Sequence, residues 1–237
     1  MTPRWLHDLL LAVAILTSSQ VVSAQKIAIV ADKLYTMSSE AQGRPGVVLI
    51  ENGKIAAVRA GSKAPDGYTV MHAVYVTPGL IDAKTTAGIS GAYNIPADQD
   101  QDEQTDPDTA DVRALDSFNP REMLLQYINT YGVTTVQSAP GITNPIAGQA
   151  GIFKTVGPKT VGPTVDELAV KPVSAIVFNL GESPKQFYGE KGKAPTTRMM
   201  TAAIFVKACL KRRLIKRSGR SGTQARKKTP AKNRLAI

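Results

Sequence analysis

The stretch that decides the fold runs from Val76 to Gly91 and reads VTPGLIDAKTTAGISG. It opens with a short apolar run, which Pro78 and Gly79 interrupt, and it then passes through residues 80–82 into a loop of small residues. An apolar run bounded by such residues is typical of a strand that ends in a turn. The residues before this stretch predict a small β unit, and those after it predict repeated strand and helix units.

The β unit before this stretch contains a well-marked hairpin. VVLI and KIAAV lie on either side of Asn52 and Gly53, a pair that accepts the positive φ values of a type I′ turn. We expect a further strand and polar turn at 26–36 and another strand at 68–76. Residues 26–76 are too few to bury much core on their own.

After the stretch, a helix followed directly by a strand is the clearest unit. Asn119 is a suitable N-cap, Pro120 suits the first helical position, and Glu122 follows three residues after the cap. Apolar residues then recur at helical spacing up to Gly132, where we expect the helix to end; they are Met123, Leu124, Tyr127, Ile128 and Tyr131. The β-branched run VTTV at 133–136 follows at once, a passage typical of α/β units.

Further along the chain, SAIVFNL at 174–180 predicts a buried strand, and 198–210 is compatible with an apolar helix. Two regions between these elements look irregular. Residues 98–116 hold eight acidic residues against one basic residue, and we expect a solvated loop there rather than a Ca²⁺ site, because the EF-hand spacing is absent. Residues 140–172 are rich in Gly, Pro and Thr and predict a long loop with short extended pieces.

The charge is unevenly distributed along the 237 residues. The chain has a net charge of +10, but 205–237 contain twelve Lys or Arg and no acidic residue, so the remainder carries 17 basic against 19 acidic residues. We expect 207–237 to be a disordered basic tail, or a sequence read out of frame. Nucleic-acid binding is not expected, because the tail lacks interleaved aromatic residues that would stack on bases.

The N-terminus has the features of a secretory signal peptide. Arg4 precedes an apolar core of eight residues, and Val22-Ser23-Ala24 fits a cleavage site, so 1–24 are expected to be removed. The apolar core is shorter than the roughly 20 residues that span a bilayer. We therefore expect an exported protein, periplasmic or extracellular, without a membrane span after cleavage. The single cysteine, Cys209, has no partner in the chain for a disulfide.

Taken together, the hairpin, the PGLID sequence and the helix leading into GVTTV resemble the amidohydrolase superfamily, in particular its imidazolonepropionase-like and dihydroorotase-like exported members. The resemblance implies an α/β fold in which a small β-sandwich flanks a metal-dependent (β/α)8 barrel. Residues 26–76 would be the N-terminal half of the sandwich and 77–206 the first part of the barrel. Barrel strands one to three would lie at 77–82, 132–137 and 174–180.

The family's metal chemistry implies a His-x-His pair directly after PGLID. Side chains two apart on a strand point the same way, so both imidazoles reach one metal, which lowers the pKa of its bound water to about 7. Here these two positions are Lys84 and Thr86, and neither is a good ligand for Zn²⁺. We therefore expect no metal and no other cofactor in this chain, although Zn²⁺ or a similar ion is expected in active members.

Asp82 and Lys84 remain the candidate catalytic residues at this motif. Lys84 could pair with Asp82, place a fixed positive charge where the metal would lie, or be a tolerated substitution in an inactive relative. Other histidines do not complete a site, because His7 lies in the signal peptide and His72 lies in the strand before the motif. A full barrel takes roughly 200–250 residues, and 77–206 supply 130, so only an N-terminal portion is expected.

The functional expectation follows from these residues. The family reaction is hydrolysis of a C–N bond in a cyclic amide or a peptide-like substrate, and we expect this chain to be inactive or truncated. The alternative is a non-catalytic exported binding or assembly protein that uses the barrel scaffold and the basic tail. No phosphate-binding loop and no nucleophile elbow is present in the sequence.

Overall fold

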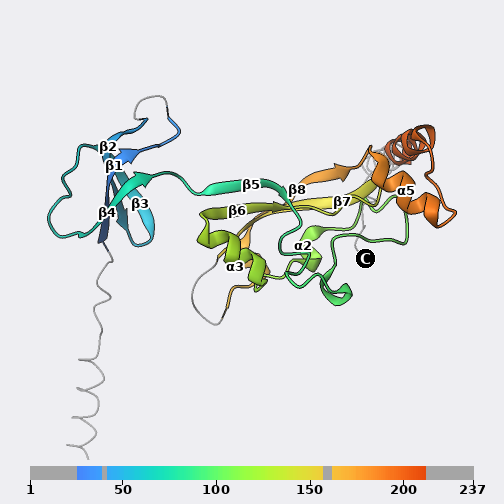
Figure 1. Ribbon diagram of the computed structural model, residues 1–237, viewed down its shortest axis with the longest axis horizontal. Coiled ribbons are helices and arrows are strands. Elements are labelled where there is room, and N and C mark those ends of the chain that lie inside the picture. Colours follow the sequence, from blue (N-terminus) through green and yellow to red (C-terminus); the bar gives the residue numbers. More distant parts are fainter. Residues whose placement is uncertain (1–25, 39–41, 157–161, 212–237) are drawn as a thin grey trace, which may run out of the picture. The chain divides into compact units, whose positions relative to one another are not determined.

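The computed structural model describes residues 26–38, 42–156 and 162–211, and Figure 1 shows the course of the chain. The expected signal peptide and most of the expected tail, 212–237, lie outside the described residues. The chain divides into two units, Met1–Pro78 and Gly79–Ile237, which are described separately below.

The first unit is a four-stranded mixed sheet. Its strands are β1 (Lys26–Leu34), β2 (Arg44–Glu51), β3 (Lys54–Ala60) and β4 (Thr69–Val76), in the order β3-β2-β1-β4. β1 pairs antiparallel with β2 and parallel with β4, and β2 pairs antiparallel with β3. The turn between β2 and β3 has φ values of 52° at Asn52 and 73° at Gly53, so the predicted type I′ hairpin is confirmed.

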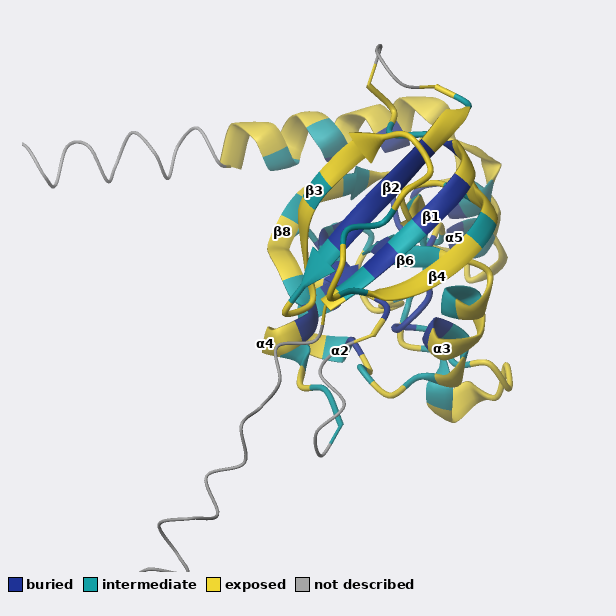
Figure 2. Ribbon diagram, turned by 90° about the vertical axis from the view of Figure 1, so that its left-hand side faces the viewer, coloured by how far each residue is buried: buried dark blue, intermediate teal, exposed yellow. Residues whose placement is uncertain are grey.

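The core of this unit lies on the two central strands. Apolar side chains of β1 and β2 are buried on both sides of the sheet, with Ala28, Val30, Val47 and Leu49 in one cluster and Ala31, Leu34 and Val48 in the other. Figure 2 shows the buried colour concentrated on β1 and β2, whereas β3 and β4 are largely exposed.

The second unit is also built on a mixed four-stranded sheet, in the order β5-β6-β7-β8. Its strands are β5 (Leu80–Thr85), β6 (Val133–Ser138), β7 (Ile146–Lys154) and β8 (Ala169–Phe178). β5 and β6 are parallel, and β7 is antiparallel to both β6 and β8. β5, β6 and β8 therefore run in one direction and β7 in the other.

Short helices surround this sheet. They are η1 (Pro96–Asp98), α2 (Ala114–Ser117), α3 (Met123–Thr130), α4 (Val165–Leu168) and α5 (Glu182–Glu190), and residues 198–211 are also helical. Phe118 stacks on Phe153 with ring centroids 3.9 Å apart, and Leu125, Val136 and Leu168 are buried in the same cluster. No helix among the described residues is both long enough and apolar enough to cross a membrane.

The α/β class predicted from the sequence is confirmed as two small mixed sheets with few helices. The half-sandwich and the incomplete barrel stay predictions. The first strand of the second unit is shifted by three residues from the predicted 77–82 to Leu80–Thr85, so that Asp82 and Lys84 lie within the strand.

Two predictions about irregular and buried segments were wrong. Residues 140–172 were expected to form a loop, but they contain β7, a nine-residue strand in the interior of the sheet. Small residues are poor strand formers, yet in β7 they let neighbouring backbone approach closely. β8 was expected to be buried, but as an edge strand it is mostly exposed.

The predicted helix is present as α3, but its start was wrong. The N-cap is Glu122, whose side chain accepts a hydrogen bond from Leu124 N, while Asn119 Oδ1 accepts one from Arg121 N in the preceding turn. Leu124, Leu125 and Ile128 face the core. Met123, Tyr127 and Tyr131, which had been assigned to that face, are exposed. α3 ends at Thr130, two residues before the predicted end at Gly132, and Gly132 has the positive φ of 86° that is typical of a residue following a helix.

The beginning of the expected disordered tail is also different from the prediction. Residues 207–211 continue the helix that starts at 198.

Candidate functional site at one edge of the second sheet

The strand directions bring the sequence-predicted residues to one edge of the second sheet. β5, β6 and β8 run the same way and β7 opposes them, so the carboxyl ends of the three parallel strands point in one direction (Figure 1). Thr85 at the end of β5 pairs with Ser138 at the end of β6, whose partner on β7 is Gly151, whereas Phe178 at the end of β8 pairs with Ile146, further along β7. In α/β barrel enzymes the reacting groups lie at the carboxyl ends of the strands. This edge is therefore the candidate functional site.

Asp82 and Lys84 are neighbours at this edge, but their side chains form no ion pair in the described structure. Asp82 is half-buried, and its Oδ1 accepts a hydrogen bond from the backbone N–H of Lys84 at 3.1 Å. The Lys84 side chain is exposed, and the ion pairs among the described residues do not include it. Asp82 thus fixes the backbone that carries Lys84 rather than neutralising its charge.

Thr86, the second position of the family's ligand pair, is held in a turn. Its hydroxyl is 3.0 Å from the hydroxyl of Ser90, and its carbonyl accepts hydrogen bonds from the N–H groups of Ile89 and Ser90. The buried Ser138 at the end of β6 donates to the carbonyl of Ala87, which ties this turn to the neighbouring strand. The turn is therefore shaped by internal hydrogen bonds.

These residues do not fit a catalytic Zn²⁺ ion. A protonated lysine offers no lone pair, and the Thr86 hydroxyl is already paired with Ser90. No group of three or more His, Cys, Asp or Glu side chains in the described parts of the chain is arranged to hold a metal. His72 is exposed on β4 of the first unit.

The sequence analysis missed a buried polar cluster beside the start of β7. Tyr188 of α5, only 1% exposed, donates a hydrogen bond from its hydroxyl to Asn144 Oδ1 at 2.7 Å. Asn144 Nδ2 donates to Thr109 Oγ1 at 3.0 Å and to the carbonyl of Glu103. Asn179, which follows β8, donates from Nδ2 to the carbonyls of Gly141 and Asn144. This cluster links four segments that are distant in the sequence.

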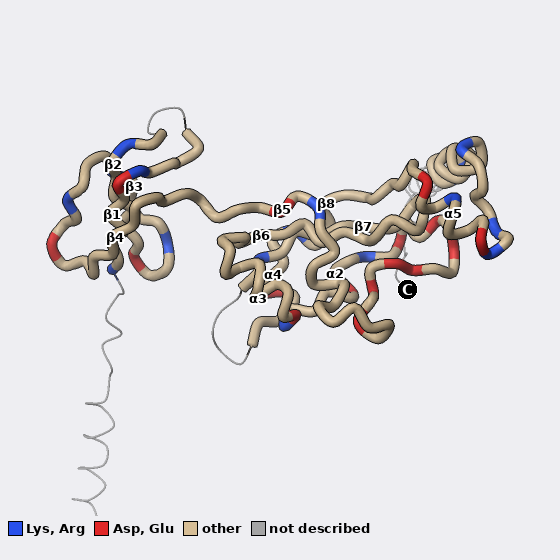
Figure 3. Tube along the Cα trace, viewed as in Figure 1, with Lys and Arg blue, Asp and Glu red and all other residues tan. Residues whose placement is uncertain are grey.

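The acidic segment 98–116 forms part of this cluster, so the expectation of a merely solvated loop was incomplete. Figure 3 shows its acidic residues along the chain that leads to α2. Asp102 Oδ1 accepts hydrogen bonds from both the backbone N and the hydroxyl of Thr143. Residues 107–113 run beside β7, with bridges from Asp108 to Ile146 and from Arg113 to Gln149. Five of the eight acidic residues of 98–116 are exposed, but these hydrogen bonds and bridges hold the backbone of the segment in place.

The environment of Tyr188 changes its acidity. Burial raises the pKa of the Tyr188 hydroxyl to about 12, and the negative charges of Asp106, Glu103 and Asp102 act in the same direction. The hydroxyl therefore remains a hydrogen-bond donor to Asn144 throughout the physiological range. A paired Asn and Tyr far apart in the sequence gave no spacing signal from which this contact could have been predicted.

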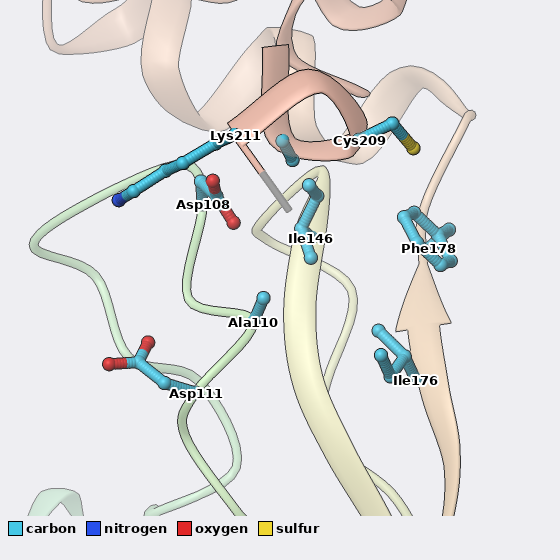
Figure 4. A pocket seen from close by; sticks show the side chains of 9 residues that line it. Asp108, Ala110, Asp111, Ile146, Ile176, Phe178, Cys209 and Lys211 are labelled. Atoms are coloured by element: carbon cyan, nitrogen blue, oxygen red, sulfur yellow. The ribbon is translucent and has the colours of Figure 1, made fainter. Parts of the chain in front are cut away.

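A cavity of about 340 Å³ opens further along β7, where Ile146 pairs with Phe178 at the end of β8. It is lined by the carboxylates of Asp108 and Asp111 and by apolar side chains of β7, β8 and the helix at 198–211 (Figure 4).

Comparison with known proteins agrees with the resemblance seen in the sequence. No family profile matches the chain. A curated relative, Amidohydrolase tasK of Hapsidospora irregularis, is 28% identical over 174 residues, which cover 69% of this chain and 18% of that protein. The crystal structure of an amidohydrolase from Thermotoga maritima MSB8 superposes with a TM-score of 0.70 and 28% identity, over 88% of this chain and 52% of the other.

In sequence and in structure the chain is thus similar to proteins of the amidohydrolase superfamily. It spans about half the length of the solved amidohydrolase and less than a fifth of the curated relative.

Proposed function

We propose that this chain is an amidohydrolase-type hydrolase scaffold whose family reaction is hydrolysis of a C–N bond in a cyclic amide or peptide-like substrate. We further propose that it does not carry out that reaction through Asp82, Lys84 and Thr86. The observation that carries this proposal is the placement of Lys84 and Thr86 two residues apart at the carboxyl end of β5, where the family has its His-x-His pair.

The geometry of β5 supports a non-metal role for Lys84. An ammonium group repels a divalent cation, and the nearby carboxylate of Asp82 is directed to the Lys84 backbone rather than into a ligand set. The exposed ammonium instead offers a fixed positive charge, to which a carbonyl or carboxylate oxygen of a small amide ligand can bind.

The larger architecture is part of the same proposal. Residues 26–76 would form half of the family's β-sandwich, and 77–206 would form the first strands of its barrel. The parallel pairing of β5 and β6 and the TM-score of 0.70 support this arrangement. The signal-like sequence of residues 1–24 supports export to a periplasmic or extracellular compartment.

Metal analysis tests the proposal. The purified chain should contain less than one equivalent of Zn²⁺, and the double variant Lys84→His/Thr86→His should bind Zn²⁺ more tightly, because it restores two imidazoles on one face of the strand end. Lys171→His/Val173→His provides the matched control, since it places the same His-x-His spacing on the exposed strand β8.

A stoichiometric metal that is bound by the unmodified chain and is required for amide hydrolysis would overturn the proposal. Equal Zn²⁺ affinity in the β5 and β8 double variants would show that the end of β5 has no special suitability for a metal.

A further inference from the structure

We propose that the cavity between β7, β8 and the helix at 198–211 binds an organic cation with an apolar body, with its ammonium group held by Asp108. This site is separate from Asp82 and Lys84, and the inference does not depend on C–N bond hydrolysis. The class of ligand is a primary amine of roughly the size of phenethylamine.

The cavity has a size and lining that suit such a ligand. Its volume of about 340 Å³ lies within the range of small-molecule sites. Ile146, Ile176 and Phe178 supply an apolar side, and Figure 4 shows Ile176 and Phe178 on the β8 side of the cavity and Asp108 and Asp111 on the other side. One end of the cavity is thus acidic and the other apolar.

One oxygen of the Asp108 carboxylate lacks a hydrogen-bond partner among the described residues. Its Oδ1 atom is buried and accepts no hydrogen bond from the described residues. A buried acceptor of this kind is costly unless a donor reaches the carboxylate, and a charged donor gives the strongest hydrogen bond. Because Oδ1 has almost no exposed surface, a ligand in the cavity would meet the carboxylate at its other oxygen, and an ammonium group there would supply the compensating charge.

The position of Asp108 is fixed before any ligand arrives. Its two neighbours pair with β7, since Ile146 N donates to the carbonyl of Pro107 at 3.2 Å and Thr109 N donates to the carbonyl of Ile146 at 2.9 Å. Residues 110–112, which follow, are also held in place. Gln149 donates a hydrogen bond from its backbone N to the carbonyl of Val112 and another from Nε2 to the carbonyl of Ala110. A preorganised carboxylate loses little freedom on binding.

The one cationic side chain in the lining of the cavity, as far as the structure is described, does not fill it. Lys211 contributes to the lining, but its ammonium is in none of the ion pairs among the described residues. Figure 4 shows that it extends past Asp108, away from Ile146 and Phe178. With Asp108 and Asp111 against Lys211, the lining keeps an excess of negative charge.

Calorimetric titration of the purified chain with phenethylammonium tests the proposal, with phenethyl alcohol as the neutral probe of similar shape. The chain should bind phenethylammonium saturably and phenethyl alcohol at least about tenfold more weakly, because the alcohol lacks the charge-assisted hydrogen bond. Asp108→Asn should weaken phenethylammonium binding to a similar extent. Asp100→Asn is the matched control, since Asp100 is an exposed acid of the same segment outside the cavity.

A second variant keeps the test decisive if Asp108→Asn does not fold. Ala208→Leu places a larger side chain in the cavity and leaves Asp108 unchanged, and it should abolish binding. Absence of saturable binding, equal binding of the alcohol, an equal loss in Asp100→Asn, or full binding by Ala208→Leu would each overturn the proposal.

Discussion

Tyr188 is the side chain on which the polar cluster of the second unit depends. It is fully buried, and its hydroxyl supplies the hydrogen-bond donor that Asn144 Oδ1 accepts. Asn144 in turn holds the acidic segment through Thr109 and Glu103. One phenol hydroxyl thus stabilises the loop that also carries Asp108.

Tyr188→Phe should therefore destabilise the chain by about 1–3 kcal/mol at neutral pH, because the buried side-chain oxygen of Asn144, Oδ1, loses the hydrogen bond from the tyrosine hydroxyl. The free energy of unfolding in urea measures the effect. Tyr127→Phe is the control: its hydroxyl is exposed and 3.3 Å from that of Tyr131, so its loss should cost much less.

The same variant makes a pH-dependent comparison possible. The pKa of Tyr188 is raised to about 12 in the folded chain, whereas an unfolded tyrosine ionises near pH 10. The folded state thus holds its proton more tightly, and this contribution to stability is complete below about pH 10 and lost as the pH rises from about 10 to 12. The stability difference between the unmodified chain and Tyr188→Phe should shrink across that window; a constant difference would contradict the assignment.

At the scale of elements, β7 depends on its small residues. Gly148 has φ 121°, a value that side chains rarely adopt, and a Cβ there would lie 2.6 Å from the carbonyl oxygen of Val112. This close approach is what lets the segment before α2 pair with the strand. The glycine is therefore a requirement of the strand's packing and not a sign of a loop.

Gly148→Ala should destabilise the second unit by roughly 2–4 kcal/mol, since backbone strain and a clash with backbone act together. Gly181→Ala is the matched control, because Gly181 has a negative φ and no atom within 4 Å of an added Cβ, and it should cost less than about 1 kcal/mol. Thermal unfolding followed by circular dichroism compares the two. Equal stabilities would mean that the segment before α2 can move away from β7 without cost.

The comparison of β7 with the hairpin of β2 and β3 shows which parts of the fold could be predicted from the sequence. Asn52 and Gly53 specify their turn locally, so the hairpin was predictable from four residues. β7 is stabilised by backbone pairing with β6, β8 and the acidic segment, none of which is visible in its own Gly- and Ala-rich sequence. The candidate site divides in the same way: Asp82 and Lys84 follow from a local motif, whereas Asp108, Asn144 and Tyr188 come together only through tertiary structure.

At the scale of the whole molecule, the second sheet presents apolar strand edges. Among the described residues, β5 and β8 are its outer strands. Leu80 and Ile81 on β5 are exposed, as are Val170 and Val173 on β8. An exposed apolar edge strand carries unpaired backbone groups that can pair with another chain. β5 carries Asp82 and the exposed Lys84 among its six residues, whereas β8 carries a single charged side chain, Lys171, among ten, so the edge of β8 is the less protected of the two.

We therefore expect the purified chain to associate as its concentration rises, through the edge of β8. Val170→Lys/Val173→Lys should reduce this association, because charged side chains on an edge strand oppose pairing with a second strand. Light scattering with size-exclusion chromatography, from micromolar to submillimolar protein, measures the apparent mass. Met123→Lys/Tyr127→Lys removes two equally exposed apolar residues from α3, and it should leave the association unchanged. If the α3 variant reduces the apparent mass as much as the β8 variant does, general apolar exposure rather than the β8 edge drives the association.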